Sequence, residues 1–172
     1  MESFNLKLQK EIYDECGFIF KEYSIVNLRE GIKVSEFGSV NCCEITLETL
    51  CSFVKQYKQN WLDVFCEVFD VEYEEAKAIT SLISNEHSHY LYLQKINLEY
   101  KRGMGIGKEI VNLIKDEYPY SEIILYPYPI PIRWQLGFDA NYMNEAKTKI
   151  VNFYKNCGFK YNSDKNVAII KN

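Results

Sequence analysis

The stretch Lys101-Arg102-Gly103-Met104-Gly105-Ile106-Gly107-Lys108 places a glycine at every second position of a short loop. An aliphatic and aromatic segment, residues 90–98, precedes it, and apolar residues recur at helical spacing from Ile106 to Ile114. The pattern predicts a strand, a glycine loop and a helix. The first N–H groups of a helix have no partner and lie at the positive end of its dipole, so glycines there let a phosphate reach the backbone. We interpret the loop as a phosphate-binding site.

Two other glycine patterns fit this loop less well. A nucleoside-triphosphate loop needs a glycine where this chain has Arg102 and a hydroxyl residue where it has Glu109. A dinucleotide fingerprint needs two residues between its second and third glycines, whereas only Ile106 separates Gly105 from Gly107. Triphosphatase and NAD-binding functions are therefore disfavoured. A purely structural turn is the alternative, and Gly158 would likewise make a good helix C-cap in any protein.

The loop matches the pattern Arg-x-x-Gly-x-Gly, and Phe153-Tyr154-Lys155-Asn156-Cys157-Gly158-Phe159 follows downstream. On these two motifs the chain resembles the GNAT superfamily of acetyl-CoA-dependent N-acetyltransferases, over roughly residues 88 to 172. The resemblance implies an α/β (α+β type) fold with a mixed, mostly antiparallel sheet flanked by helices. It also implies that acetyl-CoA is the cosubstrate and that the acceptor is a primary amine of a small molecule or peptide.

The resemblance also implies roles for individual residues. In the family, strand N–H groups orient the thioester carbonyl and the pantetheine, a task that here falls to Ile96, Asn97 and Leu98. Tyr154 is the expected general acid, because a phenol with a reference pKa of about 10 stays protonated at neutral pH and can protonate a departing thiolate. Taken alone, Tyr154 would be read as a core residue. The cofactor-binding residues expected in the loop are Arg102, Gly103, Met104, Gly105, Ile106, Gly107 and Lys108.

The sequence leaves the base and the acceptor open. An alkylamine with a pKa near about 10 is almost wholly protonated at pH 7 and must lose a proton before it attacks. Glu86, His89 and Glu99 lie near the strand in sequence, but a solvated face explains each, and none is assigned as the base. Lys147 stands seven positions before Tyr154, where many family members have a cofactor-contacting asparagine.

A proline-rich segment separates the two motifs. Pro127, Pro129 and Pro131 exclude a helix and favour an extended, stiff chain, and Trp134 follows them. Residues 127–138 either line the acceptor pocket or pack on the surface with Trp134 as their anchor.

Composition agrees with one enzyme domain over residues 1–172. The chain is 47% hydrophobic and 15% aromatic, without a linker or repeat. We expect residues 1–87 to form the variable, acceptor-side half and residues 88–172 the acetyl-CoA-binding half. The net charge of −4 disfavours nucleic acid and mildly favours a cationic acceptor. Six cysteines without a Cys-x-x-Cys pair suggest reduced, mostly buried thiols and no metal site.

The chain shows neither a signal-like start nor a long apolar run, which predicts a cytoplasmic protein with no membrane partner. A homodimer is left open. The alternative function is a non-catalytic acyl-CoA-binding or regulatory module, and a nucleotide-binding protein is a weaker one. Periodicity predicts strands at 17–26, 32–40, 90–98 and 123–126 and helices at 46–57, 72–84, 106–117 and 146–157, and leaves 61–69 ambiguous.

Overall fold

The fold was determined as a computed structural model, which describes residues 2–29, 31–83, 89–98, 105–127 and 140–171. The described strands form one seven-stranded sheet in the order β1-β2-β3-β4-β5-β7-β6. All neighbouring strands are antiparallel except β4 and β5, which are parallel. The predicted α/β architecture with a mixed, mostly antiparallel sheet is therefore confirmed. The strands are β1 (Glu2–Tyr13), β2 (Ile19–Arg29), β3 (Ile32–Thr46), β4 (His89–Leu98), β5 (Glu122–Leu125), β6 (Lys160–Asn162) and β7 (Val167–Ile170).

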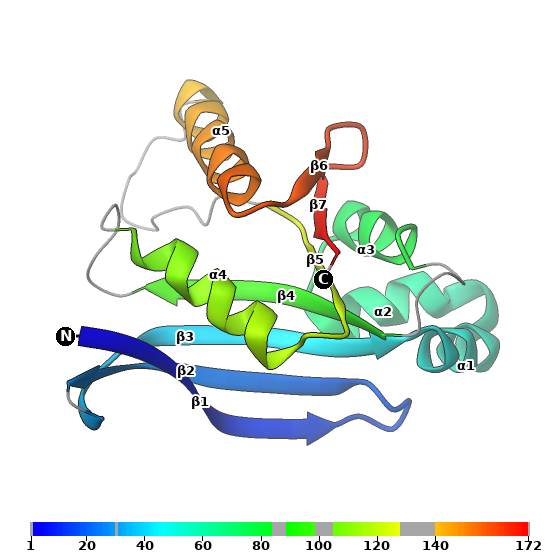
Figure 1. Ribbon diagram of the computed structural model, residues 1–172. Coiled ribbons are helices and arrows are strands. Elements are labelled where there is room, and N and C mark those ends of the chain that lie inside the picture. The colour runs from blue at the N-terminus through cyan, green and yellow to red at the C-terminus, as the bar shows by residue number, and fades with distance from the viewer. Residues whose placement is uncertain (1, 30, 84–88, 99–104, 128–139, 172) are drawn as a thin grey trace.

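Helices cover both faces of the sheet (Figure 1). Helix α4 (Ile106–Glu117) lies over one face, and α1 (Leu47–Tyr57), α2 (Trp61–Phe69) and α3 (Tyr73–Thr80) lie behind the other, with the short 3-10 turn η1 (Lys58–Asn60) between α1 and α2. Helix α5 (Ala140–Asn156) leads into the β6–β7 hairpin. No helix in the described parts of the chain is long and apolar enough to span a membrane.

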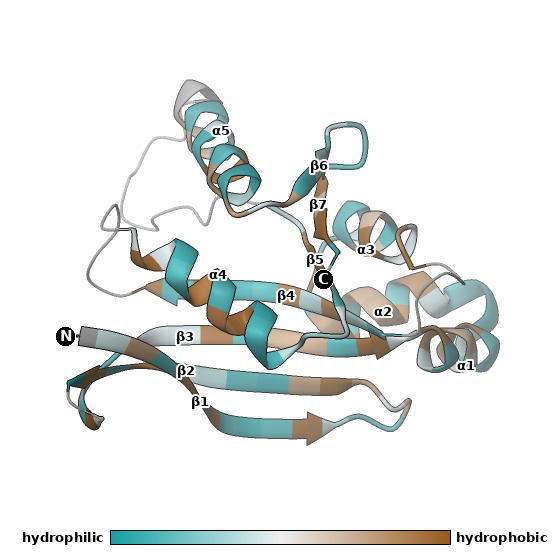
Figure 2. Cartoon of the chain, in the orientation of Figure 1, coloured by the Kyte–Doolittle hydropathy of each residue, from teal (hydrophilic) through white to brown (hydrophobic). Residues whose placement is uncertain are grey.

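The sheet separates two hydrophobic cores. On the α4 face, one cluster of buried residues joins α4 to β2, β3, β4, β5 and β7 and to the segment before β6, and Figure 2 shows the hydrophobic side of α4 turned towards the sheet. On the opposite face, a cluster rich in phenylalanine joins α1, α2 and α3 to β2, β3 and β4. Because residues alternate along a strand, Tyr90 and Tyr92 enter the second core, whereas Leu91 and Leu93 enter the first.

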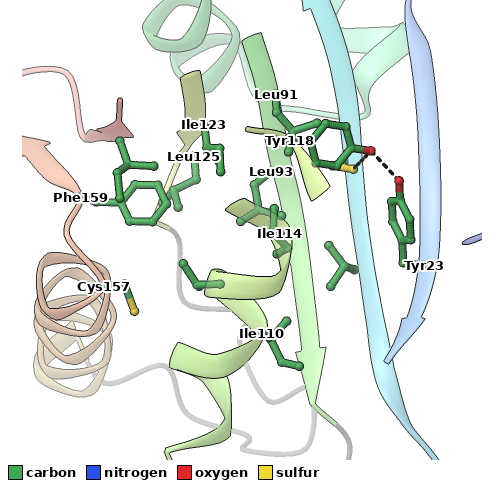
Figure 3. Packing of buried hydrophobic residues seen from close by; sticks show 14 of the residues in the cluster. Tyr23, Leu91, Leu93, Ile110, Ile114, Tyr118, Ile123, Leu125, Cys157 and Phe159 are labelled. Carbon is green, nitrogen blue, oxygen red and sulfur yellow. Dashed lines mark hydrogen bonds between the residues drawn. The ribbon is translucent and has the colours of Figure 1, made fainter. Parts of the chain in front are cut away.

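A buried hydrogen bond closes the α4-face core at the C-terminal end of the helix. The hydroxyl oxygens of Tyr23 and Tyr118 lie 2.6 Å apart, as Figure 3 shows. The thiol of Cys42 lies 3.8 Å from the same Tyr118 oxygen. The pair lets two phenols be buried in an apolar layer without an unsatisfied hydroxyl.

Two helix ends follow directly from the local sequence. Thr46 and Thr49 form a reciprocal capping box at the start of α1, in which each side chain accepts a hydrogen bond from the other residue's backbone N–H at 3.0 Å. At the end of α5, Gly158 has φ of 95° and its N–H donates to the Lys155 carbonyl, while Phe159 N–H donates to the Tyr154 carbonyl. These two bonds are a Schellman motif, which confirms Gly158 as the C-cap glycine.

The structure differs from the sequence prediction mainly at the edge strand of the sheet and at the ends of the helices and strands. Strand β1 was not predicted, because Lys and Glu interrupt its apolar residues and only one side of it is covered. The ambiguous segment 61–69 is helix α2, with Phe65 and Phe69 buried. Strand β3 continues to Thr46, and α5 begins at Ala140 instead of 146. The helix predicted to reach residue 84 ends at Thr80, where Thr80 and Ser81 hydroxyls bond to carbonyls of the last turn.

Candidate functional site

Strands β4 and β5 pair over three residues only. Only Tyr90, Leu91 and Tyr92 pair with β5, opposite Glu122, Ile123 and Ile124. Beyond Tyr92, β4 continues to Leu98 beside β3, and no strand in the described parts of the chain lies on its other side. Residues 93–98 therefore form an open edge of β4. Since strand N–H groups alternate in direction, part of this edge presents N–H groups that no described strand pairs.

A β-bulge marks the start of the open edge. Leu93 pairs with Cys42 and Lys95 pairs with Asn41, so Gln94 is an extra residue on β4. The bulge changes the alternation, and Ile96 and Leu98 accordingly pack on the α4-face core. Gln94 itself donates from Nε2 to the carbonyl oxygen of Phe69 at 3.2 Å, which connects the bulge to the end of α2.

The predicted residues Ile96, Asn97 and Leu98 all lie on the open edge. Their N–H groups alternate, so either Asn97 or its two neighbours can donate away from β3, but not all three. A Cβ atom on Gly38 would overlap the Asn97 carbonyl oxygen, so glycine is required where β3 approaches this part of β4. The end of β4 is held firmly against β3, and no strand of the described residues pairs with its other side.

The N-terminus of α4 follows the open edge. Gly105 is its N-cap residue, in the left-handed conformation with φ of 77°, and no side chain in the described residues caps this end. Among the described residues, no atom lies within 4 Å of where a Cβ atom on Gly105 would be. Ile106 is buried in the core, so only its backbone can contact a ligand, whereas the Lys108 side chain is exposed. The predicted residues Arg102, Gly103 and Met104 lie outside the described residues.

Gly107 brings the two sequence motifs together. A Cβ atom on Gly107 would lie 2.9 Å from Cζ of Phe153 on α5. The first turn of α4 and the last turns of α5 are therefore in direct contact. This packing explains the glycine at 107 without a ligand, whereas the open surroundings of Gly105 have no packing explanation among the described atoms.

Tyr154 lies beside this contact. Its ring centroid is 5.0 Å from that of Phe153 and 5.4 Å from that of Phe159, both in edge-to-face geometry. The side chain is half-buried, and in the described part of the chain its hydroxyl has no hydrogen-bond partner. Burial, with a smaller contribution from Cys157, raises the pKa of Tyr154 to about 12. A phenol with this pKa is fully protonated at neutral pH.

Of the remaining candidate residues, His89 and Lys147 lie in the described parts of the chain. His89 is the exposed first residue of β4, opposite Thr46, and Lys147 is half-buried on α5. Glu86, Glu99, Trp134 and the segment from residue 128 to 138 lie outside the described residues. All six cysteines are free, and three of them, Cys42, Cys43 and Cys157, are buried. The described residues contain no group of three or more His, Cys, Asp or Glu side chains that could hold a metal ion.

One pair of polar residues was not anticipated from the sequence. Glu75 on α3 accepts a short hydrogen bond from the hydroxyl of Tyr92 on β4. The helical spacing of the sequence places Glu75 on the apolar side of this helix, because it precedes Ile79 by four residues and Leu82 by seven. An acidic residue in such a stripe indicates a buried partner.

Comparison of this chain with models of protein families, with curated proteins and with solved structures found no match.

Proposed function

We propose that this chain is an acyl-CoA-dependent N-acyltransferase of the GNAT type, which transfers an acetyl group from acetyl-CoA to a primary amine of a small molecule or peptide. The observation that carries the proposal is the contact between Gly107 and Phe153. It joins the glycine motif to the tyrosine motif, and Phe153 packs on the same hydrophobic core as Ile96 and Leu98 of the open edge of β4. Six free thiols suit a reducing compartment, and we expect the protein to act in the cytoplasm.

The start of α4 is the proposed pyrophosphate site. An uncapped helix N-terminus offers unpaired N–H groups and the positive end of a dipole to an anion. The space around Gly105 supports this role, since nothing in the described structure fills the position of a side chain there. Arg102, three residues before Gly105, would add a bidentate cation for the phosphate oxygens.

The reaction requires hydrogen-bond donors that stabilise an oxyanion and a general acid that protonates the leaving thiolate. The amine nitrogen attacks the thioester carbon, negative charge develops on the carbonyl oxygen, and the C–S bond breaks as the amide forms. N–H groups on the open edge of β4 can stabilise the developing oxyanion. Tyr154 can protonate the departing thiolate, since its raised pKa keeps the phenol protonated. The phenolate then recovers a proton from the ammonium group of the adduct through solvent.

Binding and turnover test the proposal separately. Calorimetric titration with acetyl-CoA, CoA and ATP should give binding of the first two and not of ATP. Thiol release over a panel of primary amines should then show turnover, measured in a Cys51→Ser background because the Cys51 thiol is exposed to the reagent. Failure of acetyl-CoA to bind the folded protein would refute the assignment.

A matched pair of variants tests the site itself. Gly105→Ala places a methyl group in the proposed phosphate site and should weaken acetyl-CoA binding at least about tenfold, or 1.4 kcal/mol. Gly31→Ala is the control, because Gly31 in the β2–β3 turn has a similar φ of 80° and equally open surroundings. Both variants place an alanine at a similar positive φ, so a difference in affinity between them reports the loss of a ligand contact at Gly105.

A non-catalytic acyl-CoA-binding module is the second candidate, and one observation favours it. The Tyr154 ring is fixed between Phe153 and Phe159, and its carbonyl takes part in the Schellman motif, so packing alone explains the residue. Acetyl-CoA binding without thiol release for any amine would support this candidate.

A further inference from the structure

The Glu75–Tyr92 pair lies where β4 loses its partner. Tyr92 is the last residue of β4 that pairs with β5, and the bulge at Gln94 follows two positions later. Its ring is on the face of the sheet opposite α4, is 1% exposed, and directs its hydroxyl to Oε1 of Glu75 on α3. Gln94 holds the end of α2 at the same place. Helices α2 and α3 are thus attached to β4 at the start of its open edge.

The Glu75 carboxylate is partly buried without a cation. In the described parts of the chain no Lys, Arg or His forms an ion pair with it. The titratable groups around the pair are Glu72 at the N-cap of α3, Tyr92 on β4 and Cys43 on β3. Burial raises the pKa of Glu75, the hydrogen bond from Tyr92 lowers it, and the charge of Glu72 raises it further. The net pKa is above the ordinary value of 4.5.

The Glu75 side chain is half-buried, so it is not sealed from solvent. Tyr92 fixes one oxygen of this half-buried carboxylate. A basic carboxylate that is held in one orientation and is not sealed from solvent is suited to accept a proton.

We propose that Glu75 is the proton acceptor for the amine substrate, and that Tyr92 positions its carboxylate. This inference rests on the proposed function. Acetyl-CoA would lie at the N-terminus of α4, on one face of the sheet, and the amine would approach from the α3 face. The two reactants meet at the open edge of β4, directly after Tyr92 and Gln94.

The proton balance of the reaction needs such a group. A primary amine enters as the ammonium ion, and Glu75 takes one proton to expose the nitrogen lone pair. After attack, the nitrogen of the adduct loses its second proton, which replaces the proton that Tyr154 gives to the thiolate. Glu75 returns its proton to solvent, so the products are the amide, the free CoA thiol and one proton.

Glu75→Gln tests the proposal, because glutamine keeps an acceptor for the Tyr92 hydroxyl but cannot take a proton. We expect kcat/KM for the amine at pH 7 to fall roughly 10²-fold or more, and to recover as the pH approaches the amine pKa of about 10. The acetyl-CoA dissociation constant should not change. Glu74→Gln is the matched control, since Glu74 is the exposed neighbour on the same helix and should behave as the wild type.

Tyr92→Phe tests the positioning role by a different readout. Without the hydrogen bond that lowers its pKa, Glu75 should titrate at a higher pH, so the acidic limb of the kcat/KM profile should move to higher pH. A purely structural hydrogen bond would lower stability without moving this limb.

The outcomes separate this inference from the proposed function. If the wild-type protein fails to bind acetyl-CoA, or binds it and acetylates no amine, the proposed function fails and this inference fails with it. An active wild type whose Glu75→Gln variant keeps the same kcat/KM and pH profile would refute the role of Glu75 alone. An unmoved acidic limb in Tyr92→Phe would refute the positioning role.

Discussion

Gly107 on α4 and Phe153 on α5 are in direct contact, so closely that a Cβ atom on the glycine would lie 2.9 Å from Cζ of the phenylalanine. The contact connects two helices from separate parts of the chain at the point where each carries one of the two motifs. The aromatic ring occupies the space that any other residue at 107 would need. A glycine that looks like part of a phosphate loop in the sequence is therefore required for helix packing.

Replacing this glycine should destabilise the protein. Gly107→Ala gains about 1 kcal/mol of helix propensity, but it forces a methyl group against Phe153, and overpacking costs about 1 to 3 kcal/mol. We expect a net loss in the free energy of unfolding, measured by urea denaturation, that Phe153→Leu partly restores in the double variant. If Gly107→Ala were more stable than the wild type, the contact would be looser than the structure shows.

Tyr154→Phe should separate catalysis from folding. Its hydroxyl has no partner in the described structure, so the free energy of unfolding should change by less than about 0.5 kcal/mol. If Tyr154 is the general acid, kcat should fall on the order of 10² to 10⁴ while the acetyl-CoA dissociation constant stays the same. Because the pKa of the phenol is about 12, its ionisation should not limit kcat at pH values up to roughly 11. Unchanged turnover would make Tyr154 a packing residue.

The contributions of the Tyr23 and Tyr118 hydroxyls to the free energy of unfolding should be strongly coupled. Tyr118→Phe leaves the buried Tyr23 hydroxyl without its 2.6 Å partner, at a cost of about 1 to 3 kcal/mol. The double variant Tyr23→Phe with Tyr118→Phe should lose less than the sum of the two single changes, because no hydroxyl is then left unsatisfied. Additive losses in a denaturation cycle would mean that the two hydroxyls do not depend on each other.

Protonation of Glu75 should stabilise the folded state, and its ionisation should destabilise it. Its pKa is raised in the folded state, so the folded state binds the proton more tightly than the unfolded state. The stabilisation from this proton is full below the unfolded pKa near 4.5 and is lost as pH rises through the folded pKa. Glu75→Gln should therefore be at least as stable as the wild type at pH 7, measured as melting temperature over pH 4 to 7. A less stable variant at pH 7 would indicate a carboxylate held for structure.

The sequence predicted the elements in which pattern and position agree. The alternation from Tyr90 onwards, the helical spacing after Ile106 and the glycine at 158 correspond to β4, α4 and the end of α5. Strand β1 was missed because an edge strand is covered on one side only, and its charged residues hide the apolar period. Residues 128–139 lie outside the described structure, so the predictions for Trp134 stay predictions.

By itself, then, the sequence determined the local structure around the glycine loop and the conformation of single residues, because caps, turns and strand or helix periods depend on neighbours within a few positions. Only the tertiary structure decided that Gly107 contacts Phe153, that β4 has an open edge after Tyr92, and that Glu75 lies against Tyr92. Each of these contacts joins residues from different elements. Their proximity depends on how the sheet pairs and how the helices pack on its two faces, which no short stretch of sequence contains.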